Sequence, residues 1–198
     1  MKNEEIIEAV QRSTAEVFST MLGLEIVPGP IETAQKCPPT NEGVMSFIGL
    51  SGPWVGSGVF SCSPALACRL CEALLMTEST SVNEEVLDAV GELANMIIGN
   101  FKTVAEAVVG ALALSLPTVI YGRNFTSKSI GSTGWLVMPF SCGDERFEVR
   151  VWFRPASESG SVRQAISTSS TSADPSPSST SPAPAQQQFC YHCGAVAR

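Results

Sequence analysis

The sequence predicts an α+β fold, in which helices pack on an antiparallel-rich sheet. Helical periodicity of apolar residues is confined to three stretches, at residues 4–22, 64–76 and 82–113. Paired β-like stretches with turn residues between them lie outside these helices, and such pairs are typical of hairpins. A leading helix, a hairpin, a helix pair and then more strands therefore indicate helices layered against a sheet.

The first half of the chain supplies one helix and one hairpin. Apolar side chains recur at helical spacing over residues 4–22, and Gly23 supplies a stop. A short strand is expected at 24–27, followed by a loop containing Pro28, Pro30, Pro38 and Pro39. Residues 43–50 and 54–62 then form two strands around a Ser-Gly-Pro turn.

The two middle helices begin at recognisable N-caps. Ser63 followed by Pro64 is typical of an N-cap and the first helical position, and this helix runs to about residue 76. Ser81 and Glu84 have the spacing of a capping box, which opens a longer helix to about residue 113. Pro117 then enforces extended structure, with strands at about 118–121, 134–140 and 146–154.

The composition changes after residue 155. Residues 157–188 contain 11 Ser, 3 Thr and 4 Pro and no aromatic side chain. Such a segment buries too little apolar area to offset its ordering entropy, so we predict that it is disordered. The expected organisation is a folded domain at 1–156 and a Ser/Thr/Pro-rich tail at 157–198 that ends in a Cys-x-x-Cys motif.

Charge and apolar patterning exclude several classes of protein. The net charge is −7, which disfavours a nucleic-acid binder, since such proteins present a basic face. The longest apolar run, at 107–122, contains Pro117 and is shorter than the ~20 residues that a membrane-spanning helix needs, so no membrane insertion is expected. The acidic N-terminus does not resemble a secretory signal. The seven cysteines do not form a secreted disulfide framework, so we expect a cytoplasmic protein.

The long helix carries a narrow polar stripe. At about 100° per residue, Glu92, Asn95 and Gly99 lie within about 40° of the direction of Asp88, while the opposite side is apolar. Glu92 and Asn95 are three residues apart and project side by side. A stripe of this kind is also what a solvated helix face shows, but a glycine inside a helix costs ~1 kcal/mol against alanine and needs a reason.

The whole string from Asp88 to Asn100, Asp-Ala-Val-Gly-Glu-Leu-Ala-Asn-Met-Ile-Ile-Gly-Asn, resembles the signature helix of the CheC/CheX/FliY chemotaxis phosphatase family. The single Glu-x-x-Asn resembles the CheX branch, because CheC-type members usually carry two. The flanking Val86-Leu87 and Phe101-Lys102 fit the same pattern, as does the first helix at 17–23, and the likeness covers most of residues 4–153.

The resemblance implies an enzyme that hydrolyses the aspartyl phosphate of a CheY-like response regulator. Asn95 would then orient the attacking water and Glu92 would dock to the active-site lysine of the receiver domain, while Asp88 and Gly99 would contact the partner. The receiver would bring the Mg²⁺, so no cofactor of the chain's own is expected. Members of this branch tend to be homodimers joined through their sheets, and a dimer is expected here too.

The first helix offers a comparison. Glu8-Ala9-Val10 resembles Asp88-Ala89-Val90, which hints at a duplication. Where the long helix has Glu92 and Asn95, the first has Arg12 and Ala15, which cannot supply the same chemistry. One site per domain is therefore expected.

Two other interpretations stay open. The same helix can dock a receiver without hydrolysis, which would make the chain a binding adaptor in two-component signalling. Cys190 and Cys193 have the spacing of half a zinc site, a weaker hypothesis that needs two further ligands. Cys68 and Cys71 share that spacing but lie among leucines of a predicted helix, so a core position is favoured over a redox site.

Overall fold

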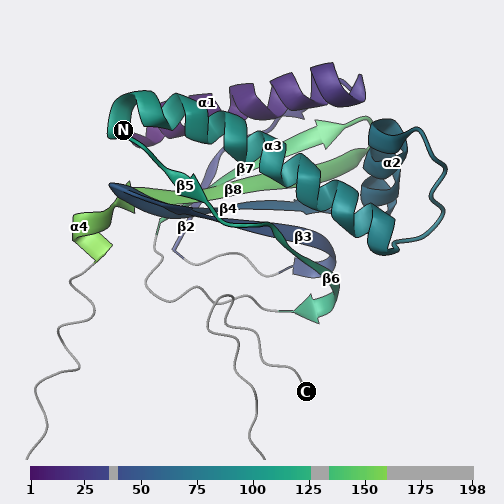
Figure 1. Cartoon of the computed structure of the whole chain (residues 1–198). Helices are drawn as coiled ribbons and strands as arrows, with labels where there is room; N and C mark the ends of the chain where they lie inside the picture. The colour runs from purple at the N-terminus through teal and green to yellow at the C-terminus, as the bar shows by residue number, and fades with distance from the viewer. Residues whose placement is uncertain (36–39, 126–133, 160–198) are drawn as a thin grey trace, which may run out of the picture.

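The computed structural model describes residues 1–35, 40–125 and 134–159, and these form a two-layer α/β arrangement. Three helices lie on one face of a sheet: α1 (Asn3–Val17), α2 (Pro64–Leu75) and α3 (Glu84–Val109). In Figure 1, α1 and α3 lie above the sheet, and the short α4 (Ala156–Ser159) lies below its left end. The predicted α+β class, with helices on an antiparallel sheet, is confirmed.

The sheet is antiparallel in every pairing among the described residues. Its strand order is β1-β7-β8-β4-β3-β5, with β2 also on β7 and β6 also on β3. The strands are β1 (Val27–Pro28), β2 (Glu32–Ala34), β3 (Thr40–Ser51), β4 (Trp54–Cys62), β5 (Ala113–Leu114), β6 (Thr118–Phe125), β7 (Trp135–Cys142) and β8 (Glu145–Pro155). The predicted hairpin is the β3–β4 pair, and the predicted strands near 118, 134 and 146 are β6, β7 and β8.

The helix starts differ from the prediction at one place. Ser63 caps α2 as expected, and its Oγ accepts the N–H of Leu66 at 3.0 Å. The N-cap of α3, however, is Asn83, whose Oδ1 accepts the N–H of Val86 at 3.0 Å. The capping box predicted at Ser81 is therefore wrong: Asn83 is an equally good cap two residues later.

Two helix ends also differ. Gly23 stops the first helix in a left-handed conformation, φ +63°, but residues Phe18–Leu22 before it form a π-helical turn, η1. The long helix ends at Val109 rather than near 113, because Gly110 takes φ +91° and ends the helical repeat.

Three short elements were not expected. The strand predicted at 24–27 is present only as β1, at 27–28, while β2 falls within the segment predicted to be a loop. β5 and α4 were predicted as helix and as tail, respectively. Residues 36–39, the 126–133 segment and the predicted tail beyond residue 159 lie outside the described residues.

The two faces of the sheet hold separate apolar clusters. The main core lies between the helices and the sheet, and Trp54 packs against it. A second cluster consists of Met45, Val59 and Trp135 with Phe47 and Trp152 packed against it. Within the described ranges, no helix is both long and apolar enough to cross a bilayer.

Candidate functional site

The inner face of α3 is fixed against the sheet by two glycines. A Cβ on Gly58 of β4 would collide with the side chain of Ile98, so Ile98 sits directly over that glycine. A Cβ on Gly91 would lie 3.2 Å from Cγ2 of Val119 in β6 and 3.7 Å from Cγ of Pro117. Because these contacts set which side of α3 faces the sheet, they also set which side faces outward.

The polar stripe is the outward side. Asp88 and Glu92 are exposed and Asn95 is half-buried, whereas Leu93, Ala94 and the other inner residues of the helix are buried. Within the part of the chain that the structure describes, the side chains of Asp88, Glu92 and Asn95 make no hydrogen bond or ion pair. An acid and an amide are thus presented together, with their hydrogen-bonding capacity unused by this chain.

Gly99 lies one turn beyond Asn95 in open surroundings. A Cβ built on it would have no neighbouring atom within 4 Å, apart from its own helix backbone and chain neighbours. The Oγ1 of Thr103 donates to the Gly99 carbonyl at 3.1 Å, which is a contact within the helix. Packing inside this chain therefore does not explain why position 99 is a glycine.

The far end of the stripe is occupied by an ion pair. Nζ of Lys102 lies 2.8 Å from Oε1 of Glu106, and the same oxygen accepts the N–H of Leu112 at 2.8 Å. These bonds, led by that from Lys102, hold the pKa of Glu106 below its ordinary value. Glu106 thus ties the segment after the helix back to its last turns, a role that the sequence analysis missed because it placed residue 112 inside the helix.

Comparisons with known proteins give the family. The family described as "Chemotaxis phosphatase CheX" matches residues 44–141. The CheY-P phosphatase CheX of Thermotoga maritima is 28% identical over 148 residues, which cover 74% of this chain and 94% of that protein. The chain belongs to the CheC/CheX family.

Solved structures agree with this assignment. The chemotaxis protein CheX of Vibrio vulnificus is 27% identical with a TM-score of 0.66, covering 76% of this chain and 99% of that one. The Borrelia burgdorferi structure of CheX with CheY, BeF3 and Mg²⁺ is 26% identical with a TM-score of 0.60, covering 75% and 97%. FliY of Thermotoga maritima, at 16% identity and a TM-score of 0.59, shares the fold.

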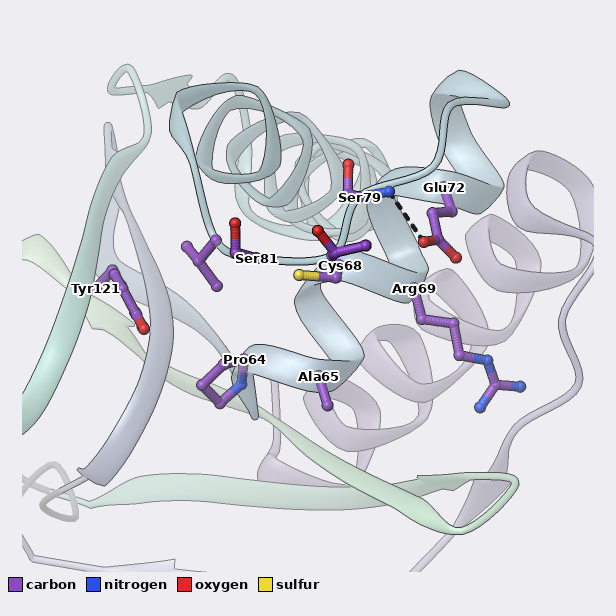
Figure 2. A pocket seen from close by; sticks show the side chains of 10 residues that line it. Pro64, Ala65, Cys68, Arg69, Glu72, Ser79, Ser81 and Tyr121 are labelled. Carbon is purple, nitrogen blue, oxygen red and sulfur yellow. Dashed lines mark hydrogen bonds between the residues drawn. The ribbon is translucent and has the colours of Figure 1, made fainter.

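A groove of about 560 Å³ lies elsewhere on this CheC/CheX domain (Figure 2). It lies between α2, the segment at 79–82 and Tyr121 of β6, and none of the stripe residues lines it. Figure 2 shows Arg69 directed away from Tyr121, and its Nη1 donates to the Cys142 carbonyl at 3.4 Å. Glu72 is occupied by the N–H of Ser79 at 3.0 Å. Its charged groups are therefore engaged in holding the fold.

Two cysteines of the CheC/CheX domain, Cys62 and Cys68, are poor nucleophiles because little of their thiol is ionised. Burial, followed by the neighbouring Cys71 and Glu72, raises the pKa of the half-buried Cys68 thiol. Burial also raises the pKa of Cys62, strongly. Cys71 is buried in the core as predicted. The described residues hold no group of three or more potential metal ligands. Cys190 and Cys193 lie outside the described residues, so the zinc hypothesis is untested.

Proposed function

We propose that this chain hydrolyses the aspartyl phosphate of a phosphorylated CheY-like receiver domain. The observation that carries the proposal is the outward pair of Glu92 and Asn95 on α3, without partners in the described chain. The relative from Thermotoga maritima is named a CheY-P phosphatase, and the relative from Borrelia burgdorferi was solved with CheY. Both support a receiver domain as the substrate.

Asn95 is proposed to orient the attacking water. An acyl phosphate is already activated, and a receiver domain supplies its own Mg²⁺ and lysine to stabilise the transferring group, so that positioning of water is what remains to be added. A neutral amide can accept a hydrogen bond from water through its oxygen while its NH₂ group donates to the partner. A carboxylate at this position would repel the phosphoryl oxygens, which explains why an amide is suitable.

Glu92 is proposed to dock the helix through the receiver lysine. It lies three residues before Asn95, on the same side of α3, so a charge-assisted hydrogen bond from the lysine would fix how far Asn95 enters the phospho-site. Its exposure leaves it free to make this bond.

Asp88 and Gly99 are proposed to lie at the two margins of the same contact. Asp88 is one turn before Glu92 and exposed, and Gly99 is one turn beyond Asn95 with open space above it. A side chain at position 99 would project toward the partner, so a glycine leaves room for the loops around the phospho-site.

The surroundings of the reaction follow from the same proposal. The chain needs no cofactor of its own, since the Mg²⁺ would arrive with the receiver. We place the reaction in the cytoplasm, where the thiols of Cys62, Cys68, Cys71 and Cys142 stay reduced, as they are here. A homodimer joined through the sheets is also proposed; because each domain carries a complete Glu92–Asn95 pair, activity per domain should not depend on the dimer.

The test follows the loss of phosphate from a phosphorylated CheY-like receiver with and without this chain. Asn95→Ala should reduce the acceleration on the order of 100-fold, in line with the loss of one positioning group. Asn100→Ala is the matched control, because it removes the same amide from the same helix outside the stripe. Equal rates for wild type and Asn95→Ala would overturn the catalytic proposal.

Docking is tested by Glu92→Gln, with Glu84→Gln in the first turn of α3 as its control. Loss of the charge at 92 should raise the protein concentration needed for half-maximal acceleration, whereas loss at 84 should not. Saturable binding of the receiver by the wild-type chain with no acceleration at any concentration would identify the alternative, a receiver-binding adaptor without catalysis.

A further inference from the structure

The chain that follows α3 returns along the same helix. In Figure 1 it leaves the left end of α3 and passes beneath the helix through β5 to β6. One end is held by the bond from the Leu112 N–H to Glu106, and the other by the approach of Pro117 and Val119 to Gly91. Positions 91 and 106 are 15 residues apart, a rise of about 22 Å, which an extended chain of about seven residues covers. The segment is therefore extended and antiparallel to α3.

This course places Leu116 level with Asn95. Leu116 is about two residues, or about 7 Å, from the middle of the contact with Gly91. The same distance along α3 is about four residues, which leads from Gly91 to Asn95. Asn95 is half-buried although Asp88 and Glu92 on the same stripe are exposed, which agrees with a segment of chain beside it.

The register of the sheet edge changes by one residue between β6 and β5. Phe47 of β3 is in register with Thr118, whereas Leu50 is in register with Leu114. Two residues of β3 therefore oppose three residues of the edge chain, at 115–117, which is a β-bulge. A bulge bends its strand and changes the direction of a side chain.

Ser115 shows which residues form the bulge. Its N–H donates to the Gly49 carbonyl at 2.9 Å, and its Oγ accepts the Gly49 N–H at 2.9 Å. Leu116 and Pro117 are then both opposite Ile48. Ile48 belongs to the core under the helices, and Pro117 approaches α3. The bulge therefore lies on the side of the sheet that carries the polar stripe.

Leu116 is nevertheless open to solvent. It is 87% exposed, whereas Leu112 is buried and Leu114 is half-buried. Its position is also fixed, because the Ser115 hydroxyl donates to the Leu116 carbonyl at 2.9 Å and a residue before proline, here Pro117, is held extended. A bulge and a proline protect an edge strand from pairing with another chain, and charged side chains serve the same purpose. Edge protection therefore does not account for a leucine.

The polar stripe has no apolar side chain of its own. Asp88, Glu92 and Asn95 are polar, and Gly99 has no side chain. The centre of a protein interface is more apolar than this, and a stable interface buries about 800 Å² on each partner. A residue beside a helix of about 10–12 Å diameter lies well within that area, so a partner seated on the stripe would also cover Leu116.

We propose that Leu116 is the apolar docking contact for the receiver domain, and that it favours receivers whose surface beside the phospho-site is apolar. The inference rests on the proposed function, since the receiver is the partner named there. Leu116 acts on binding rather than on the chemical step, because its side chain has no group that could orient water. A receiver with a charged side chain at the contact would have to desolvate that charge against the leucine and would bind less tightly.

The experiment measures the acceleration of receiver dephosphorylation as a function of the concentration of this chain. Leu116→Ala should raise the concentration for half-maximal acceleration about tenfold and leave the maximal acceleration unchanged, since the ground state and the transition state lose the same contact. Leu116→Met keeps a similar apolar area and should stay within about twofold of wild type. Val27→Ala is the matched control, because Val27 is an exposed apolar residue of β1 at the opposite edge of the sheet, and it should change neither quantity.

A second measurement separates this inference from the proposed function. Binding to the receiver loaded with beryllofluoride and Mg²⁺, a stable mimic of the phosphorylated state, is titrated without any hydrolysis. Leu116→Ala should bind about tenfold more weakly than wild type. This result without acceleration by the wild-type chain would support the docking contact and overturn only the proposed hydrolysis.

Equal affinities, or equal half-maximal concentrations, for wild type and Leu116→Ala overturn the inference and leave the proposal for Glu92 and Asn95 standing. A lower maximal acceleration at unchanged affinity also overturns it, since Leu116 would then act in the chemical step. Absence of saturable binding by the wild-type chain overturns both.

Discussion

Helix α3 contains two glycines, one in each half, and the space around them differs. In the N-terminal half, Gly91 is buried, and a Cβ there would press on Val119 and Pro117. In the C-terminal half, Gly99 has open space where a Cβ would be. Both positions carry the same helix-destabilising residue, yet only Gly91 is required by packing within the chain.

The difference separates a glycine required for packing of the fold from one that we explain by contact with a partner. Gly91 lets α3 approach β6, and this approach sets the height of the helix on which Glu92 stands. Gly99 lowers the stability of the helix, and no packing contact within the described chain requires a glycine there. The contact that we propose with the receiver would explain it. Mutations at the two positions should therefore have opposite patterns of effect on stability and activity.

The largest effect is expected from Gly91→Leu. A leucine side chain has no room between α3 and β6, and overpacking of this kind lowers the free energy of unfolding by about 1–3 kcal/mol. Urea unfolding measures this. Combining Gly91→Leu with Val119→Ala should recover part of the loss, and additive losses in the double variant would contradict the contact that we describe.

Gly99→Leu is the matched change on the outer side. It should leave the free energy of unfolding unchanged or slightly raised, while it lowers the acceleration of receiver dephosphorylation on the order of tenfold, or about 1.4 kcal/mol. Full activity with a leucine at this position would show that the partner does not approach Gly99.

Gly99→Ala separates the cost of the glycine from the space that it leaves. Alanine should raise the free energy of unfolding by about 0.5–1 kcal/mol, since it removes the propensity penalty and meets no atom. Thermal and urea unfolding both report this gain. A loss of stability on this change would mean that position 99 is not in open surroundings.

The C-terminal half also carries the smallest predicted effect, at Glu106. Its pKa in the folded state is lowered, so the bonds to Lys102 and Leu112 add stability above the ordinary carboxyl value of 4.5, and this part is lost as the pH falls through the lower folded-state value. Glu106→Gln should therefore be slightly less stable than wild type at pH 7 and equal to it at the acid end. A constant difference across that range would refute the assignment.

The glycines also show how far the sequence leads. The helical periodicity around Asp88 and the Glu-x-x-Asn spacing were enough to predict α3 and the side that bears Glu92 and Asn95. Nothing local distinguishes Gly91 from Gly99, because the difference depends on Val119, a residue of β6 that is 28 positions away from Gly91 in the sequence. Only the tertiary contact separates the two.

The errors in the predicted elements have related causes. Ser81 and Asn83 are both residues that favour the N-cap position, and they lie two positions apart. Local chemistry does not choose between them. β2 has only three residues and is defined by its pairing with β7, so it has no alternation to detect. Trp54 packs against the core under the helices, whereas Trp135 belongs to the second cluster. The alternation of side chains along a strand does not tell which face of the sheet the helices cover.

One consequence concerns how this protein can change over generations. The Asn95 side chain makes no hydrogen bond with the described part of its own chain. Selection for correct folding therefore does not act against substitution of this residue. Under the proposed role of Asn95, a substitution there would give a protein that folds and still binds the receiver through Glu92 but does not hydrolyse its phosphate. Such a variant, made beside an intact copy, would compete with that copy for the receiver.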